Sequence, residues 1–281
     1  MFFTRLISGV VLVLAAIALF FFGGIGLAAA LGVLALVGAF ELLRVFGLEK
    51  HPLGIVTYVG IAGYYILMSC LNYEFEMWSA GIIILLFLAL LLVYVIKYPA
   101  YHINEVTKCL FTFFYLAVML GYIYKVRCCE AGQWLVWLIL ISSWGSDTCA
   151  YLTGKLIGKH HFSELSPKKT VEGCVGGIVG AAVIAAVFAC FFPNTAAGPG
   201  AGELFHVNPM ILFPVVAALC ALISQLGDLA ASAIKRNYDK KDYGTVILGH
   251  GGVLDRFDSV IFVAPVIYYL LVAFMFAGFY G

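Results

Sequence analysis

Long apolar segments recur along almost the whole of this chain, and they restrict its fold more than any other feature of the sequence. Each is close to the ~20 residues that a helix needs to cross the hydrocarbon core of a bilayer. The sequence therefore predicts an all-α, polytopic integral membrane protein with about nine transmembrane helices. The expected helices span residues 5–22, 25–46, 53–71, 77–97, 107–124, 133–154, 173–192, 209–234 and 258–280.

The composition supports a membrane protein and excludes other classes. Of the 281 residues, 64% are hydrophobic and only 11% are charged, whereas an average soluble domain is roughly 25% charged. So few charged side chains cannot cover a soluble protein of this length, and a disordered chain would need low hydrophobicity and a high net charge. The formal net charge of +1 gives no reason to expect a nucleic-acid partner.

The distribution of basic residues predicts the orientation of the chain in the membrane. Lysine and arginine concentrate in cytoplasmic loops, and nine passes that begin inside place fourteen of the 16 basic residues in the cytoplasm. Only Lys125 and Arg127 then lie outside. We expect a cytoplasmic N-terminus and a cytoplasmic active site, and the length and nine-pass layout suit a bacterial inner membrane.

Charged residues divide the chain into two regions. Residues 1–130 are expected to form about five N-terminal transmembrane helices, with most of their polar residues at helix ends. Residues 131–281 are expected to form a C-terminal catalytic transmembrane region, because acidic and basic residues crowd into two of its cytoplasmic loops. The chemistry is therefore expected in the C-terminal region.

The densest group of polar residues lies between 225 and 258. Asp228, Ser232 and Lys235 are spaced i, i+4 and i+7, so a helix would place them on one face. An aspartate in a membrane helix is costly and usually marks an ion or substrate pathway. Asp255 and Asp258 follow as i, i+3 neighbours at the start of the last expected helix. Basic residues accompany these carboxylates: Lys235, Arg236, Lys241 and Arg256.

These residue types together suit a site for a divalent cation and phosphate groups. Hard cations prefer carboxylate oxygens, and Mg²⁺ commonly bridges carboxylates to substrate phosphates. The two glycines after His250 carry no side chain, which allows the backbone to approach an anion closely. The alternative is that these are ordinary loop charges paired for solubility, but this explains poorly why Asp228 lies within an apolar run.

A second group of polar residues lies between 143 and 173. Asp147 and Tyr151 would share a helix face, and Asp147 lies deep enough in its apolar segment to need a partner or water. The segment 166–170, Ser-Pro-Lys-Lys-Thr, combines hydroxyl and ammonium groups that are suitable donors to phosphate oxygens. Alternatively, this segment is a polar turn in which Thr170 caps the next helix.

These motifs resemble the signature of the phosphatidate cytidylyltransferases, also called CDP-diacylglycerol synthases. The resemblance is carried by Ser232-x-x-Lys235-Arg236-x4-Lys241-Asp242-x-Gly244 and by His250-Gly251-Gly252-Val253-x-Asp255-Arg256-Phe257-Asp258. The segments 146–151 and 166–173 are also similar to that family, as are the length and the number of expected helices. One position departs from the pattern, because Leu248 stands where the family usually has proline two residues before the histidine.

The resemblance implies transfer of a cytidylyl group from CTP to phosphatidic acid, giving CDP-diacylglycerol and pyrophosphate in phospholipid biosynthesis. A phosphate monoester with a second pKa of about 6 is largely a dianion at neutral pH, so no strong general base is needed. Catalysis then depends on positioning and on charge stabilisation. We expect Mg²⁺ or Mn²⁺ as the cofactor, two cations in all, with a monovalent cation as an alternative. The resemblance also suggests a homodimer within the lipid membrane.

Roles for individual side chains follow from their chemistry and from this resemblance. We expect Asp228 and Asp255 to be the main metal ligands, and Asp258 to be a further ligand or to orient Arg256. Phosphates of CTP or of the lipid are expected to bind Lys235, Arg236, Lys241 and Arg256. The expected substrate-binding set also contains Ser232, Ser166, Lys168, Lys169, Asp147 and His250. Within this set Asp147 would bind a second cation or the cytosine side, and His250 would fix the turn.

Two other functions remain as alternatives. An ion-coupled transporter also places aspartate and lysine within helices, but inverted repeats and broken helices in both halves would then be expected. A CDP-alcohol phosphotransferase would need an Asp-Gly pair, and none occurs in the 281 residues. The clustering of polar residues in one half of the chain favours the cytidylyltransferase.

Overall fold

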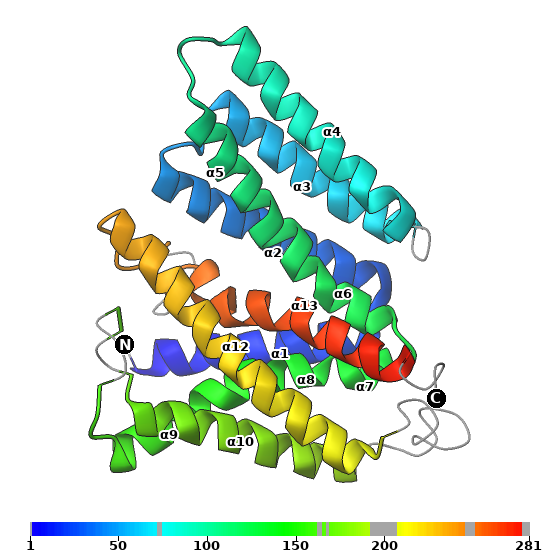
Figure 1. The fold of residues 1–281 in the computed structure, drawn as a ribbon, viewed down its shortest axis with the longest axis vertical. Helices are drawn as coiled ribbons and strands as arrows, with labels where there is room; N and C mark the ends of the chain where they lie inside the picture. Colours follow the sequence, from blue (N-terminus) through cyan, green and yellow to red (C-terminus); the bar gives the residue numbers. More distant parts are fainter. Residues whose placement is uncertain are drawn as a thin grey trace. The chain divides into compact units, whose positions relative to one another are not determined.

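The computed structural model describes residues 2–71, 75–161, 165–166, 169–191, 207–244 and 251–276, which are helical almost throughout (Figure 1). Within these ranges the one pairing of extended residues is an antiparallel bridge between His161 and Thr170. The all-α prediction is confirmed. In chain order the helices are α1 (Phe2–Phe22), α2 (Gly24–Phe46), α3 (Pro52–Leu71), α4 (Phe75–Ile96), α5 (Ile103–Phe113), the π-helix η2 (Phe114–Val118), α6 (Met119–Cys128), α7 (Gly132–Leu135), α8 (Trp137–Leu140), the π-helix η3 (Ile141–Gly145), α9 (Ser146–Ile157), α10 (Val171–Cys190), α12 (Pro209–Asn237) and α13 (Leu254–Phe276).

Eight helical spans among the described residues are long and apolar enough to cross a membrane. They are Gly24–Phe46, Pro52–Leu71, Met77–Ile96, Ile103–Cys128, Gly132–Ile157, Val171–Cys190, Pro209–Asn237 and Leu254–Met275. The polytopic membrane fold is therefore confirmed. The apolar part of α1, Gly9–Phe22, is shorter, so the ninth crossing and the cytoplasmic N-terminus stay predictions.

The helix α12 continues through Asn237, past the expected end at residue 234. Its last turn contains Lys235 and Arg236, and Lys235 thus lies on the same helix as Asp228, as its spacing from Asp228 predicted. A helix C-terminus carries partial negative charge and favours cations, so these two residues are compatible with the final turn.

The chain forms two compact units, which are described separately. The first unit consists of Met1–Tyr124 and Asn237–Phe257, and the second consists of Lys125–Arg236 and Asp258–Gly281. The segment that contains Lys241 and Asp255 thus belongs with the N-terminal helices, whereas Asp228 and Asp258 lie in the second unit.

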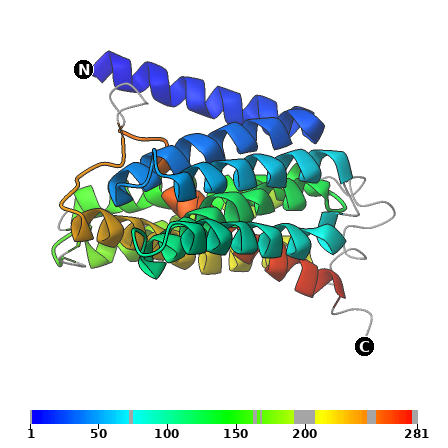
Figure 2. The same ribbon diagram turned by 90° about the horizontal axis from the view of Figure 1, so that it is seen from above.

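In the first unit, glycines on α2 let neighbouring helices approach closely. A Cβ at Gly32 would lie 3.1 Å from the Cβ of Tyr65 on α3, and a Cβ at Gly38 would lie 3.0 Å from Leu116 in η2. In this unit α3 contacts α2, α4 and α5, and α5 also contacts α2 and α4; Figure 2 shows the axes of these helices lying roughly parallel or antiparallel. Gly47 ends α2 in a left-handed conformation with φ of 73°, which glycine adopts at helix ends without steric cost.

In the second unit, α9 and α10 pack closely through glycines of α10. These glycines repeat at the four-residue spacing that lets two membrane helices approach: Gly173, Gly176, Gly177 and Gly180. A Cβ at Gly176 would collide with Thr153 on α9, and a Cβ at Gly180 would collide with Cys149. A buried hydrogen bond from Nε2 of Gln225 to the carbonyl of Cys174, 2.9 Å long, joins α12 to α10.

Candidate active site

Asp228, the acidic residue within α12, forms an ion pair with Lys169. Its Oδ2 lies 2.5 Å from the Nζ of Lys169, and the two side chains are 29% and 25% exposed. The ammonium nitrogen itself is buried. Charges attract more strongly where water is partly excluded, so this pair meets the need of Asp228 for a partner within an apolar helix. The structure thus brings a predicted metal ligand and a predicted phosphate-binding lysine together.

Asp258, near the start of α13, adds a second carboxyl group to this pair. The side chains of Asp228 and Asp258 are in hydrogen-bond contact, and Lys235 is near enough to interact with Asp258 through its charge. Asp258 is only 6% exposed, and its Oδ1 accepts a hydrogen bond of 2.8 Å from the N–H of Ser259. The two helices come close because residue 227 is glycine: a Cβ at Gly227 would lie 2.9 Å from the carbonyl oxygen of Asp258.

The cluster of Asp228, Asp258 and Lys169 has the composition of a site for a cation or a phosphate group. Two carboxyl groups in contact repel each other when both are ionised, and a bound cation relieves that repulsion. Mg²⁺ is commonly bound by one or two carboxylates together with substrate phosphates and water, so this pair fits that ion. The described part of the chain contains no group of three or more His, Cys, Asp or Glu side chains that could hold a metal.

Asp255, the other expected main metal ligand, lies in the first unit and joins two parts of the chain. Its Oδ2 accepts hydrogen bonds from the N–H of Tyr243 at 2.9 Å and from the N–H of Gly252 at 3.0 Å. One carboxylate oxygen therefore ties residue 243 to residue 252. Lys241 and Arg256, in the same unit, are exposed. The metal-binding role of Asp255 stays a prediction.

Glu41, on α2, is a buried acidic residue that the sequence analysis missed. Its side chain is fully buried, and its two oxygens accept hydrogen bonds from the N–H groups of Val253 and Leu254 at 3.0 and 2.9 Å. The signal that could have found it is the one that singled out Asp228, an acidic residue inside an apolar run. The sequence predicted that the residues after 130 carry the chemistry. Glu41 lies before that boundary, and it binds the backbone of residues 253 and 254 beside Asp255.

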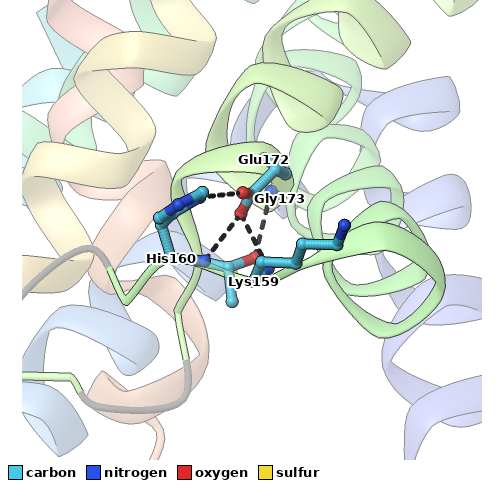
Figure 3. Close-up of polar contacts among 5 residues, drawn as sticks. Lys159, His160, Glu172 and Gly173 are labelled. Carbon is cyan, nitrogen blue, oxygen red and sulfur yellow. Dashed lines mark hydrogen bonds and ion pairs between the residues drawn. The ribbon is translucent and has the colours of Figure 1, made fainter.

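Glu172, in the first turn of α10, binds the backbone of residues 159 and 160, which precede the segment 166–170 (Figure 3). Its Oε2 accepts hydrogen bonds from the N–H groups of Lys159 and His160 at 3.1 and 3.2 Å. Its Oε1 lies 2.5 Å from Nδ1 of His160. The Oγ1 of Thr170 accepts a hydrogen bond of 3.1 Å from the N–H of Gly173, so Thr170 caps α10 as the alternative interpretation of this segment predicted. Glu172 belongs to the segment 166–173 that carries part of the resemblance, but the sequence predicted no role for it, and His160 was not singled out.

Asp147 lies in the first turn of α9, directly after η3, and is half-buried. Single π-helical turns are frequent at functional sites. Near it, the hydroxyls of Ser142 and Ser146 are buried and make no hydrogen bond to another described residue. Buried hydroxyls without a partner are unusual, so this turn has polar groups available beside Asp147.

The other predicted residues on α12 follow Asp228 along that helix. Ser232 is half-buried one turn beyond it, and Lys235 and Arg236 lie in the last turn, half-buried and exposed respectively. These three residues therefore extend from the half-buried Asp228 to the end of the helix.

Of the remaining predicted substrate-binding residues, Ser166, Lys168 and His250, the structure describes only Ser166. Ser166 is half-buried, and its carbonyl accepts a hydrogen bond of 3.0 Å from the N–H of Lys169. Two further predicted residues, Lys168 and His250, lie outside the described residues. Their expected roles stay predictions.

Comparison with known proteins gives one family over nearly the whole chain. The model of the cytidylyltransferase family matches residues 3–274. A phosphatidate cytidylyltransferase of Bacillus subtilis is 33% identical over 279 residues, which cover 96% of this chain and 97% of the relative. Proteins of the same name from Staphylococcus aureus and Staphylococcus saprophyticus are 36% and 34% identical over 165 residues, or 58% of each chain.

Proposed function

This chain belongs to the cytidylyltransferase family, and we propose that it transfers a cytidylyl group from CTP to phosphatidic acid. A phosphate oxygen of the lipid attacks the α-phosphorus of CTP, and the bond from that phosphorus to the β-phosphate oxygen breaks. The products are CDP-diacylglycerol and pyrophosphate. The observation that carries this proposal is the contact of Asp228 with both Lys169 and Asp258, in a chain that is 33% identical to a phosphatidate cytidylyltransferase over 96% of its length.

The residues of the second unit suit the electrostatic demands of this reaction. The attacking phosphate is largely a dianion at neutral pH, so the chain must bring it close to a strongly anionic triphosphate. Lys169 and Lys235 supply positive charge beside the carboxyl pair. Lys169 can exchange Asp228 for a phosphate oxygen, because both are anionic acceptors for an ammonium group.

We propose that Asp228 and Asp258, in the second unit, hold a Mg²⁺ or Mn²⁺ ion; for Asp255, in the first unit, we propose separately the role of a metal ligand. When bound, such an ion neutralises charge on the triphosphate and on the leaving pyrophosphate. The contact between Asp228 and Asp258 supports this assignment, because a cation relieves the repulsion between neighbouring carboxylates. A second cation, divalent or monovalent, is part of the same proposal.

The proposed location is a bacterial inner membrane, with the active site on the cytoplasmic side. The excess of lysine and arginine in the loops assigned to the cytoplasm supports this orientation, and CTP is a cytosolic substrate. A homodimer within the membrane is also proposed, from the resemblance to the family.

The test of this function is an assay on the purified protein in detergent with CTP, phosphatidic acid and Mg²⁺. We expect equal amounts of pyrophosphate and of CDP-diacylglycerol, no turnover with a metal chelator, and weak turnover when water-soluble glycerol phosphate replaces the lipid. A folded protein that releases no pyrophosphate, or releases it equally without phosphatidic acid, would contradict the proposal. Uptake of solute into vesicles without turnover of CTP would instead favour the transporter.

A further inference from the structure

Glu41 is a fully buried carboxylate in the membrane span Gly24–Phe46. An ionisable side chain at such a position is costly, so it usually pairs with another group and serves a function. The proposed chemistry gives Glu41 no part. Its hydrogen bonds from Val253 and Leu254, however, tie it to the segment that carries Asp255.

Both carboxylate oxygens of Glu41 bind the backbone at the start of α13. Oε1 accepts the N–H of Val253 and Oε2 accepts the N–H of Leu254. The first N–H groups of a helix have no partner within the helix, and they favour a negative charge. The residue before α13 is valine, whose side chain cannot accept a hydrogen bond. Through Glu41, α2 supplies the cap that the local sequence of α13 lacks.

Two glycines allow the backbone to reach this carboxylate. A Cβ at Gly252 would lie 2.6 Å from Oε2 of Glu41, and a Cβ at Gly244 would collide with Oε1. Arg44, nearly one turn further along α2, donates a hydrogen bond of 3.1 Å from Nη2 to the carbonyl of Tyr243. Glu41 and Arg44, with the backbone of 243–244 and 252–254, form what we call the Glu41 network.

Asp255 is held by the same backbone, because its Oδ2 accepts hydrogen bonds from the N–H groups of Tyr243 and Gly252. We propose that Glu41 is a positioning residue for Asp255: it fixes the backbone that determines where this carboxylate and the adjacent Arg256 lie. The inference rests on the proposed function, in which Asp255 is a metal ligand and Arg256 binds phosphate. Glu41 itself touches neither substrate nor cation in this proposal.

The first test measures the contact itself and needs no turnover. In Glu41→Gln, an NH₂ group replaces one oxygen and cannot accept a hydrogen bond. One of the N–H groups of Val253 and Leu254 then loses its acceptor, and we expect its hydrogen exchange to become about tenfold faster or more. Unchanged exchange at both residues would show that Glu41 does not hold this backbone.

The second test measures how turnover depends on Mg²⁺. Loss of a group that orients a metal ligand typically lowers metal affinity by about 10–100-fold. The half-saturating Mg²⁺ concentration of Glu41→Gln should therefore rise about tenfold or more. A merely structural role would reduce the amount of active enzyme, which lowers the rate without moving this concentration.

Glu105→Gln is the matched control for this measurement. Oε2 of Glu105 accepts a hydrogen bond of 3.1 Å from the N–H of His102 at the start of α5. The variant makes the same chemical change at the start of another helix of the same unit, where the remaining amide oxygen can still accept the single hydrogen bond. It should keep the wild-type half-saturating concentration. An equal shift in both variants, or no shift in Glu41→Gln, would overturn the proposal.

Gly252→Ala keeps the test decisive if Glu41→Gln fails to fold. Its added Cβ meets the Glu41 carboxylate, while at Gly63 a Cβ would meet nothing within 4 Å. Gly252→Ala should raise the half-saturating Mg²⁺ concentration and Gly63→Ala should not; wild-type behaviour of Gly252→Ala would refute the role of the network. If the wild-type protein releases no pyrophosphate, the proposed function fails, whereas the exchange measurement still decides the contact of Glu41.

Discussion

Asp228→Asn removes a negative charge from the proposed site and keeps the size of the side chain. In the wild type this carboxylate lies 2.5 Å from the Nζ of Lys169 and contacts the carboxyl group of Asp258. The substitution weakens the ion pair, which destabilises the fold, and it also removes repulsion between two carboxyl groups, which stabilises it. Because these effects oppose each other and the pair is partly exposed, we expect the free energy of unfolding to change by no more than about 1–2 kcal/mol.

The effect of Asp228→Asn on catalysis should be much larger. Loss of a direct contact to a metal or to transition-state charge typically costs ~3–4 kcal/mol, or about 10²–10³ in rate. A stability change of about 1–2 kcal/mol leaves most molecules folded in a protein of ordinary stability. The expected result is therefore a fall in kcat of about 10²–10³ in protein that elutes like the wild type.

The assay for this prediction is pyrophosphate release at saturating Mg²⁺, CTP and phosphatidic acid. Asp239→Asn is the control, because it makes the same chemical change at an exposed residue with φ of 52°, a conformation that asparagine tolerates. It should keep wild-type turnover. If folded Asp228→Asn keeps more than about a tenth of wild-type turnover, Asp228 is not a catalytic metal ligand. The site would then have to be rebuilt around Asp255, Asp258 and Asp147.

Three further predictions address the other parts of the protein. Asp255→Asn should lower pyrophosphate release by about 10² or more, and wild-type turnover would remove Asp255 from the proposed ligands. Gly176→Val should lower the free energy of unfolding by about 1–3 kcal/mol, because the new valine side chain would collide with Thr153. As a control in thermal unfolding, Gly81→Val should have little effect, because a Cβ at Gly81 would meet nothing within 4 Å. In a variant whose eight native cysteines are replaced by serine, Leu165→Cys should react with a membrane-impermeant maleimide only after cells are permeabilised, and reaction in intact cells would reverse the proposed orientation.

The membrane helices could be predicted from sequence because an apolar run in lipid has few structural solutions. A helix satisfies all its backbone hydrogen bonds internally, whereas exposed irregular chain does not. The helix expected at 25–46 is thus observed at Gly24–Phe46. The cap at Thr170 could also be predicted from the sequence, because it depends on two residues that are three apart in the chain. Both predictions use information that is local to the chain.

The contacts of the site could not be predicted in the same way. Asp228 and Asp258 lie on different helices and Lys169 lies before a third, so their meeting depends on tertiary packing. Gly227 permits that packing, but a single glycine in an apolar helix has no specific meaning in sequence. Glu41 differs, because its position in an apolar run was visible; only its partners, the backbone N–H groups of 253–254, were not.

The buried carboxylates of the two units differ in a way that bears on what each can bind. Both oxygens of Glu41 are occupied by backbone N–H groups, and a cation there would have to displace the cap of α13. Asp228 and Asp258 instead contact each other and a lysine. A contact between two carboxyl groups, and the contact of a flexible lysine side chain, can be replaced by a cation and a phosphate without breaking a helix. Burial of an acidic residue therefore does not by itself indicate a ligand site. The partners of the carboxylate decide: one held by backbone N–H groups positions the chain, whereas one held by exchangeable side chains can bind a cation.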